Sequence, residues 1–274
     1  MKLIKMTFAV IVMALTMGAC SLFSKSDKNV SEDDETQEKT ITNNKTFTVN
    51  DVKFTMVKVE GGTFTMGASG KLIDKAEQDE YPAHKVKLAS YYIGQTEVTQ
   101  ELWLAVMGDN PSQFRGADLP VEQVSWHNCQ EFITRLNNLT GEKFRLPTEA
   151  EWEFAARGGN QSKGYAYSGS DNLFNVAWWG DNSDGVTHPV ATKQANELGI
   201  YDMSGNVWEW CNDWLGDYNS SEQANPVGPS TGGCRVTRGG SFAADYVYNG
   251  WRVSDRNCSS PEFIAGNLGF RLAL

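Results

Sequence analysis

The stretch RLPTEAEWEFAARGG (residues 145–159) carries the clearest local structural signal in the chain. Thr148 and Glu151 have the spacing of a capping box, in which a hydroxyl and a carboxylate satisfy the first free amide groups of a helix. Pro147 precedes this cap, and Gly158 follows at the other end, where glycine accepts the left-handed conformation that stops a helix. The stretch therefore predicts one short helix with defined ends.

The segments before this helix predict two further helices and several short strands. Residues 99–108 begin with an N-capping Thr and end in Gly, and residues 125–141 carry Phe, Ile and Leu on one helical face. Residues 54–67 alternate in polarity around a Gly pair, which predicts a hairpin, and residues 84–94 alternate again. No long helix is predicted after residue 159. The expected fold class is therefore α+β, with few helices, short strands and much irregular backbone.

Composition limits the classes of partner. The 274 residues include 26 Gly and 9 Trp and carry a formal charge of −10. An acidic chain of this kind is a poor partner for nucleic acid or for an anionic membrane surface. The abundance of Gly and Trp is typical of a loop-rich globular domain. Nucleic acid is therefore not expected among the partners.

The N-terminus has the features of a bacterial export signal. Lys2 and Lys5 precede an apolar run over residues 6–17, which is too short for a stable membrane-spanning helix. Small residues then lead to Cys20, as in a lipoprotein cleavage site, so residues 1–19 are expected to be a signal peptide and Cys20 the lipidated residue. The alternative is an ordinary secretory signal with an incidental Cys. In the lipoprotein interpretation, the protein contacts the membrane through its lipid anchor only.

Residues 20–50 are polar and charged, which predicts a disordered tether because such a segment buries too little surface to order itself. The folded domain is expected to span residues 51–274. Export places the protein in the bacterial cell envelope, at the outer membrane or cell surface, where disulfides form. The other cysteines allow three pairings, and the sequence does not choose among them: Cys129, Cys211, Cys234 and Cys258.

The segment YDMSGNVWEW (residues 201–210) has the spacing of a cation-binding turn. Asp202 and Glu209 supply two carboxylates, and the carbonyl groups of Gly205 and Val207 lie between them. Oxygen ligands of this kind suit calcium. By spacing alone, however, a turn with two solvated acids is the simpler interpretation.

Several segments in the same order resemble the formylglycine-generating enzyme, or sulfatase-modifying-factor, family, and together they cover essentially all of residues 51–274. They are VEGGTFTMG (59–67), YYIGQTEVT (91–99), LPVEQVSW (119–126), RLPTEAEWEFAARGG (145–159), GIYDMSGNVWEW (199–210), RVTRGGSF (235–242) and NLGFRLAL (267–274). The family has a variant of the C-type lectin fold with little regular secondary structure. The resemblance therefore implies that fold for this chain.

The resemblance also implies two calcium sites. One falls on the turn at residues 201–210, where both acids are present, and this makes structural calcium the expected cofactor. The other would begin with Asn175 and the carbonyl of Val176, with Asp184 as a candidate further ligand.

The family's copper-binding residues are missing. Its oxidases hold copper(I) through two cysteines, and soft thiolates are what copper(I) requires. Counted from Ser241, the corresponding positions hold Ala244 and Asn249. Neither side chain replaces a thiolate, so copper is not an expected cofactor and formylglycine formation by the known copper chemistry is not expected.

The segment between RGGSF and NLGFR falls on the family's catalytic cleft and is expected to form a ligand-binding surface. It mixes aromatic, acidic, amide and small side chains. Aromatic residues give rigid contact area, and the polar residues add hydrogen bonds. The candidate ligand-binding residues are Ala244, Asp245, Tyr246, Tyr248, Asn249, Trp251, Asp255, Asn257 and Phe263.

Codon chemistry offers one origin for this mixture. Substituting the adenines of an Asn codon never yields Met, Trp, Lys, Gln or Glu, and residues 242–250, 257–260 and 263–267 contain none of these. The pattern resembles lipoproteins of this same fold that retroelements diversify by mutating adenines. An ordinary degenerate loop in a non-catalytic relative is the alternative.

Three functional hypotheses follow. The first is a tethered, non-catalytic lipoprotein that binds an unknown protein or small molecule through its C-terminal surface. The second is a sulfatase-modifying factor or accessory protein that acts in oxidation of a sulfatase cysteine to formylglycine. The third is a structural envelope lipoprotein without a small ligand. The missing copper cysteines favour the first, because function depends on the site rather than on the fold.

Overall fold

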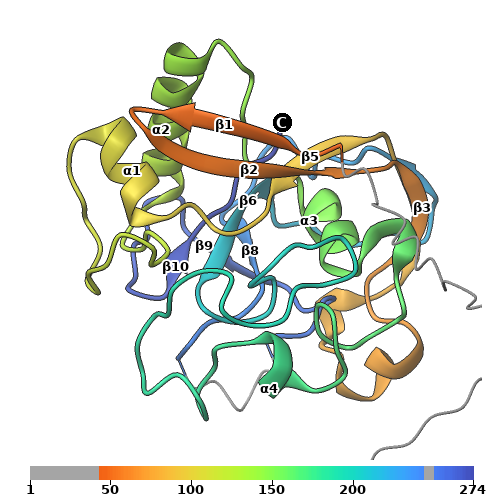
Figure 1. The fold of residues 1–274 in the computed structure, drawn as a ribbon. Helices are drawn as coiled ribbons and strands as arrows, with labels where there is room; N and C mark the ends of the chain where they lie inside the picture. The colour runs from red at the N-terminus through yellow and green to blue at the C-terminus, as the bar shows by residue number, and fades with distance from the viewer. Residues whose placement is uncertain (1–42, 244–249) are drawn as a thin grey trace, which may run out of the picture. The chain divides into compact units, whose positions relative to one another are not determined.

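The first sheet of the computed structural model has the strand order β1-β2-β5 and is antiparallel throughout. Its strands are β1 (Lys45–Val49), β2 (Val52–Val59) and β5 (Tyr91–Gly94). Phe47 and Phe54 are cross-strand partners whose stacked ring centroids lie 5.5 Å apart. The structure describes residues 43–243 and 250–274, and this sheet can be followed in red to yellow in Figure 1.

Two further sheets carry the rest of the strands. One has the order β10-β6-β8-β9, and the other has the order β3-β4-β7. The first consists of β6 (Trp208–Trp214), β8 (Arg235–Arg238), β9 (Asn257–Ser259) and β10 (Leu268–Gly269). The second consists of β3 (Gly62–Met66), β4 (His84–Leu88) and β7 (Gln223–Ala224). The four-stranded sheet joins β6 to the closing region of the chain, by which we mean residues 235–274.

The helices are few and mostly short, as the sequence predicts. They are α1 (Gln100–Met107), α2 (Trp126–Thr140), α3 (Glu149–Ala156) and α4 (Leu173–Val176), with 3₁₀ turns η1 (Gly70–Lys75), η2 (Gln78–Glu80) and η3 (Gly159–Gln161). The predicted capping box is present at α3, where the Thr148 hydroxyl accepts from the Glu151 amide at 3.2 Å and the Glu151 carboxylate accepts from the Thr148 amide at 2.9 Å. In the described part of the chain, no helix is long and apolar enough to cross a membrane.

The predicted hairpin over residues 54–67 is wrong. β2 and β3 are consecutive, but β2 pairs with β1 and β5 while β3 pairs with β4 and β7. The chain changes sheets at Gly61, where a Cβ atom would lie 2.6 Å from the Leu88 carbonyl oxygen. Because the connection between β4 and β5 crosses so close to this point, the two strands separate instead of turning back on each other. The alternating residues 84–94 are likewise divided between β4 and β5.

The folded unit begins before the expected boundary at residue 51. Residues 45–49 form β1, which pairs with β2 along its whole length, so they are not part of a disordered tether. Alternation of Phe47 and Val49 with polar residues marks this strand, and both apolar side chains pack into the core beneath the sheet. The expected signal peptide, the expected lipidation site Cys20 and the rest of the expected tether up to residue 42 lie outside the described residues.

Buried tryptophans connect the irregular backbone to the core. Trp210 is fully buried and donates its indole N–H to the Val124 carbonyl at 3.0 Å. Trp152 is also fully buried and donates to the Glu209 carboxylate at 2.8 Å. Each ring buries a large apolar surface while its indole N–H donates to an acceptor from a distant part of the chain.

Candidate functional site

Four buried arginines hold the closing region of the chain in place. Each is paired with a glutamate from an earlier segment, in the pairs Arg238–Glu153, Arg252–Glu80, Arg256–Glu149 and Arg271–Glu209. In the last three pairs, two guanidinium nitrogens contact the two carboxylate oxygens. Bidentate contacts fix both direction and distance. They fasten the closing region to η2, α3 and β6.

The turn Arg238-Gly239-Gly240-Ser241 forms one end of this framework. Gly240 has φ +71°, and a Cβ atom there would lie 2.5 Å from the Trp251 ring. Trp251 donates its indole N–H to the Ser241 carbonyl at 2.8 Å. Glycine at 240 is therefore required both by its backbone conformation and by the close approach of an aromatic ring.

Beside this turn, a surface hollow of about 210 Å³ opens over the four-stranded sheet. We call it the Trp208 hollow, and its lining residues are Trp208, Thr237, Asn257, Ser259, Phe263, Asn267 and Leu268. Its aromatic surfaces are the half-buried Trp208 and Phe263, whose side chain is 50% exposed. A Cβ atom on Gly250 would lie 2.9 Å from the Trp208 ring, so the Gly250 backbone lies directly against this ring.

Two of the candidate ligand-binding residues lie in the Trp208 hollow and two lie in the interior. Asn257 and Phe263 line the hollow. Trp251 and Asp255 are each only 3% exposed. The Asp255 carboxylate accepts from Arg252 at 3.1 Å, and burial raises its pKa to about 8. The prediction of Asp255 as a surface ligand residue is therefore wrong, because this side chain belongs to the arginine framework.

The remaining candidates lie outside the described residues, namely Ala244, Asp245, Tyr246, Tyr248 and Asn249. The structure also adds residues that the sequence interpretation missed. Trp208, Ser259 and Asn267 line the Trp208 hollow beside Asn257 and Phe263. Trp208 and Asn267 stand in two of the segments that carry the family resemblance, and the pairing of β6 with β10 brings them together.

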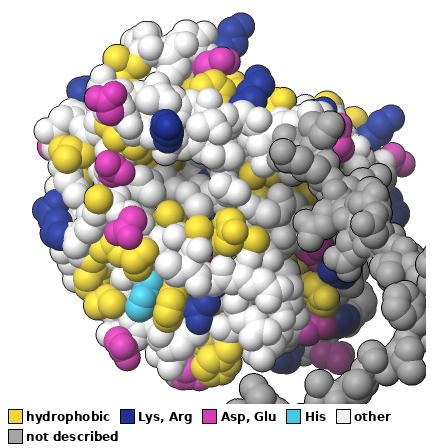
Figure 2. Space-filling model, viewed as in Figure 1, with side chains coloured by type: hydrophobic (Ala, Val, Ile, Leu, Met, Phe, Trp, Pro, Cys, Tyr) yellow, Lys and Arg dark blue, Asp and Glu magenta, His cyan; other side chains and the backbone are white. Residues whose placement is uncertain are grey.

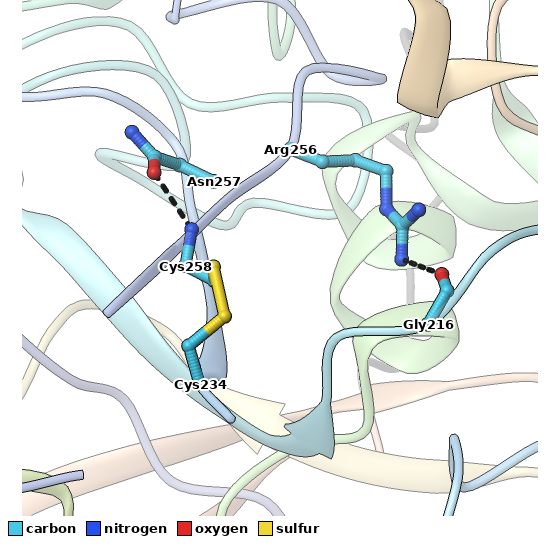
Figure 3. The surroundings of a disulfide bond; sticks show 5 residues. All are labelled: Gly216, Cys234, Arg256, Asn257 and Cys258. Atoms are coloured by element: carbon cyan, nitrogen blue, oxygen red, sulfur yellow. Dashed lines mark hydrogen bonds between the residues drawn. A yellow bond between two sulfur atoms is a disulfide. The ribbon is translucent and has the colours of Figure 1, made fainter. Parts of the chain in front are cut away.

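A disulfide joins the two strands beside the Trp208 hollow. Cys234 and Cys258 are bonded, with Cα atoms 5.6 Å apart, and they link β8 to β9 (Figure 3). Asn257 and Arg256, which precede Cys258, extend to opposite sides of the backbone, and Arg256 reaches the Gly216 carbonyl in the interior (Figure 3). The disulfide therefore holds the chain just after Arg256, which belongs to the buried arginine pairs, and Asn257, which lines the Trp208 hollow.

The other two cysteines of the folded unit are not exposed thiols. Cys129 and Cys211 are free and fully buried in the two core clusters. Burial raises the pKa of both thiols well above its usual value. A buried thiol with a raised pKa is a poor nucleophile and a poor metal ligand. Both side chains pack in the hydrophobic core.

The turn expected to bind calcium has one carboxylate engaged and one partly free. Glu209 accepts from both Arg271 nitrogens at 2.6 Å and from Trp152 at 2.8 Å, so both its oxygens have partners. Asp202 accepts from the Ala191 amide through Oδ2, whereas its buried Oδ1 has no N–H donor among the described residues. In this arrangement Asp202 can serve as a cation ligand. Glu209 could bind a cation only by giving up its contacts with Arg271.

A further acid lies beside Asp202. Glu97 is 2% exposed, and its carboxyl group lies within hydrogen-bonding reach of the Asp202 carboxyl group, with no N–H donor to either Glu97 oxygen among the described residues. Burial, together with the charge of Asp202, raises the pKa of Glu97 well above its usual value, and burial raises that of Asp202 to about 6. Buried carboxyl oxygens without an N–H donor are stabilised by a proton or by a cation.

The second expected calcium site is less complete. Asn175 is exposed in α4, and its carbonyl accepts from the Gln194 amide at 3.0 Å. Val176 is buried, and Asp184 is exposed with φ +55°. Within residues 43–243 and 250–274, no three His, Cys, Asp or Glu side chains are grouped as they would be around a metal ion.

The face of the molecule viewed in Figure 2 carries hydrophobic side chains in separate patches with acidic side chains between them. Large apolar residues that are about half exposed include Leu104, Phe174, Phe263 and Ile264. Scattered apolar residues are ordinary on a protein surface, so the aromatic side chains that line hollows are the informative ones.

Comparison with known proteins relates most of this chain to one family. The family described as "Sulfatase-modifying factor enzyme 1-like domain" matches residues 40–274. The chaperone protein LppX of Paenibacillus barcinonensis is 35% identical over 78% of this chain and 85% of its own length. The formylglycine-generating enzyme of Streptomyces coelicolor is 32% identical over 79% of this chain and 88% of its own.

A solved structure is also similar over most of this chain. Treponema denticola variable protein 1 is 36% identical to this chain, with a TM-score of 0.75, and the match covers 84% of this chain and 98% of that one. The expected α+β fold of the formylglycine-generating enzyme type is confirmed. The chain belongs to the formylglycine-generating enzyme, or sulfatase-modifying-factor, family.

Proposed function

We propose that the protein is a non-catalytic member of this family that binds a ligand at the Trp208 hollow. The observation that carries the proposal is the convergence of Trp208, Asn257, Phe263 and Asn267 on one hollow. Gly250 lies against the Trp208 ring of this hollow, and in the sequence the copper-ligand positions just before it hold Ala244 and Asn249. The rigid framework beneath it is what a binding surface requires, because preorganised side chains lose little entropy on binding.

The chemistry of the hollow suits an uncharged ligand with a flat apolar face. Trp208 and Phe263 provide aromatic surface, and Thr237, Ser259 and Asn257 provide hydroxyl and amide groups. No Asp, Glu, Lys or Arg is among its lining residues within the described chain. An aromatic or amide side chain of a protein partner, or a small molecule with similar groups, meets these requirements.

Fragment binding tests this proposal directly. The full chain is screened by ligand-observed NMR against indoles, aromatic amides and small neutral sugars, and hits are retested on two variants. Phe263→Ala removes an exposed ring of the hollow, and Leu104→Ala removes a similarly exposed side chain of α1 as the matched control. We expect about tenfold weaker binding for Phe263→Ala alone, a typical loss for an aromatic contact residue. Equal binding by both variants would contradict the proposal.

A second candidate is a role in formylglycine formation, favoured by the identity with formylglycine-generating enzymes over most of the chain. Purified protein is incubated with copper(I), oxygen and a peptide carrying a sulfatase-type cysteine, and the peptide mass is measured. The absence of thiols at residues 244 and 249 leads us to expect no aldehyde product. Formation of the aldehyde would make this second candidate the correct one.

Calcium is part of the proposal as a structural ion at Asp202, with Gly205 and Val207 as carbonyl ligands. Support comes from the two adjacent buried carboxyl groups of Asp202 and Glu97, in which Asp202 Oδ1 and both Glu97 oxygens have no N–H donor among the described residues. Calcium at one hundred times its Kd should raise the melting temperature by about 5–10 °C relative to chelator. Asp202→Asn should remove this rise, and Glu262→Gln, a change at an exposed acid, should keep it. A melting temperature that does not change with calcium would contradict a calcium site at Asp202.

Genetic diversification of the C-terminal segment is proposed from the codon pattern at residues 242–250. A solved relative bears the name Treponema denticola variable protein 1, which supports the comparison. The nucleotide sequence decides the matter. A reverse-transcriptase gene with a near-copy of this 3′ end beside it would establish diversification, and a locus without them would remove it.

A further inference from the structure

A small cavity of about 70 Å³ is lined by the end of β6, the start of α3 and residues of the segment 216–229. We call it the Asp213 cavity, and the lining residues that carry its chemistry are His84, Glu149, Asp213, Asp217, Gly228 and Arg256. Asp217 and Gly228 are exposed, so the cavity opens to solvent on their side. It shares no lining residue with the Trp208 hollow, and a role for it is therefore independent of the proposed function.

Asp213 supplies the cavity with an unoccupied acceptor. This residue is 4% exposed, and its Oδ2 accepts from the Glu149 amide at 3.1 Å. Its Oδ1 has no hydrogen-bond partner among the described residues. A Cβ atom on Gly228 would lie 3.2 Å from Oδ1, so this oxygen lies beside the glycine at the open side of the cavity. A side chain at position 228 would crowd the oxygen, and glycine leaves it accessible.

His84 supplies a second buried acceptor. It is 4% exposed, and its Nδ1 lies 3.1 Å from the Pro82 carbonyl oxygen. Because a carbonyl oxygen only accepts, Nδ1 carries the proton and Nε2 of the neutral ring holds a lone pair. Nε2 has no hydrogen-bond partner within the described part of the chain. The ring is held against Tyr218, with centroids 4.8 Å apart. The cavity thus presents fixed acceptors that call for a donor.

The charges around Asp213 favour a cation as that donor. Arg256 is already engaged by Glu149 through two contacts of 2.6 and 2.8 Å, and it also reaches the Gly216 carbonyl (Figure 3). Burial raises the pKa of Asp213 to about 8. The charges of Glu149 and Glu151 each raise this pKa more than Arg256 lowers it. The field at Asp213 is therefore negative, and a cation that replaced its proton would be stabilised there.

We propose that the Asp213 cavity binds the primary ammonium group of a small amine. Such a group has three N–H donors and no acceptor, which matches a cavity whose open polar atoms are acceptors. Asp213 Oδ1 and His84 Nε2 accept two of the three, and the adjoining methylene carbon contacts Met66 and Ala150, which also line the cavity. The bound amine displaces the Asp213 proton to solvent, so that a buried ion pair forms in place of a neutral carboxyl group.

The size and the ligand set of the cavity both select this class of cation. Its volume is several times what one water molecule requires, which suits an ammonium group with one or two carbon atoms. Among residues 43–243 and 250–274, no three His, Cys, Asp or Glu side chains are grouped as they would be around a metal ion. A metal ion would therefore lack ligands here, whereas an ammonium group requires only hydrogen-bond acceptors.

Ethylammonium chloride and ethanol are the matched probes, because the alcohol has a similar length and carries no charge. Potassium chloride at the same concentration controls for ionic strength and for a monovalent cation without N–H donors. Calorimetry on the full chain gives the Kd. At ten times this Kd, ethylammonium should raise the melting temperature by about 3–6 °C over potassium, and ethanol should give no rise. Equal melting temperatures in ethylammonium and potassium at tens of millimolar would overturn the proposal.

Proton release distinguishes the bound amine from a general stabilising effect. At pH 7 the Asp213 carboxyl group is mostly protonated, so binding should release close to one proton, measured by calorimetry in buffers of different ionisation enthalpy. Affinity should rise as the pH is raised from 6 to 8. Asp213→Asn, which keeps an acceptor for the Glu149 amide, should abolish the release and lower affinity at least about tenfold. Binding without proton release would contradict the assignment to Asp213.

Two more variants locate the site. His84→Phe keeps a ring against Tyr218 but removes the acceptor, and it should weaken binding several-fold. Glu262→Gln, at an exposed acid outside the cavity, is the matched control and should leave binding unchanged. Equal losses in Glu262→Gln and Asp213→Asn would show that the amine responds to overall charge, and would overturn the proposal. Failure of amine binding leaves the fragment result for the Trp208 hollow unaffected.

Discussion

Arg271 illustrates how single residues carry this fold. Its guanidinium is fully buried, pairs with Glu209 through two contacts of 2.6 Å and donates to the carbonyls of Gly94 and Tyr201 at 3.0 Å. Arg271→Met should lower the free energy of unfolding by about 3–5 kcal/mol, because it leaves the Glu209 charge buried and uncompensated. Urea denaturation measures this loss.

The matched control is Arg135→Met. Arg135 pairs with Glu131 one helical turn away on the exposed face of α2. Removing such a pair should cost only about 0.3–0.5 kcal/mol. Similar losses in the two variants would show that the buried arginines do not hold the closing region as described.

Buried aspartates predict a pH dependence of stability. Burial raises the pKa of both Asp213 and Asp255 from 3.8 to about 8. The folded state therefore retains protons that the unfolded state has already lost, and stability should fall as pH rises from about 4 through about 8. Asp213→Asn, which keeps an acceptor for the Glu149 amide, should flatten the thermal-melting profile over this range. A profile of Asp213→Asn as steep as that of the wild type would contradict the assignment.

At the scale of elements, the Cys234–Cys258 disulfide should stabilise both the fold and the Trp208 hollow. It closes a loop with a sequence separation of 24, for which the loss of unfolded-state entropy corresponds to about 3.5 kcal/mol. Replacing both cysteines by serine should reduce the free energy of unfolding by about this amount. Dithiothreitol should destabilise the wild type similarly and leave the variant unaffected, and an unaffected wild type would argue against the bond.

Helices were predictable from the sequence, whereas strand pairing was not. Caps such as Thr148 with Glu151 act within one turn, so their pattern is visible in the sequence alone. The partners of β2 and β3 depend on a crossing of two connections at Gly61, which is a contact between distant segments. Local periodicity holds no information about such a contact.

The Trp208 hollow was predictable only in part for the same reason. Asn257 and Phe263 were identified because they lie in the compositionally mixed segment, but Asp255 has the same appearance in the sequence and is buried beneath Arg252. Trp208 comes from β6 and Asn267 from the residue before β10, and only the sheet brings them to Asn257. Local composition marked the region, and the tertiary fold chose the residues.

At the scale of the whole molecule, we propose that a lipid on Cys20 tethers the folded unit to the envelope. Export with an N-terminal lipid predicts that the full-length protein incorporates labelled palmitate and partitions into detergent. Cys20→Ala should abolish both while leaving the melting temperature of the folded unit unchanged. Labelling that persists in Cys20→Ala would contradict the anchor assignment.

A ligand in the Trp208 hollow would contact the Trp208 indole, whose N–H signal therefore reports on binding directly. Indole N–H signals of the nine tryptophans are recorded by ¹⁵N NMR, and the Trp208 signal is assigned with Trp208→Phe. On addition of a fragment selected for binding, we expect a saturable shift of the Trp208 signal that is lost in Phe263→Ala. Saturable shifts confined to other tryptophans, with Trp208 unmoved, would contradict it.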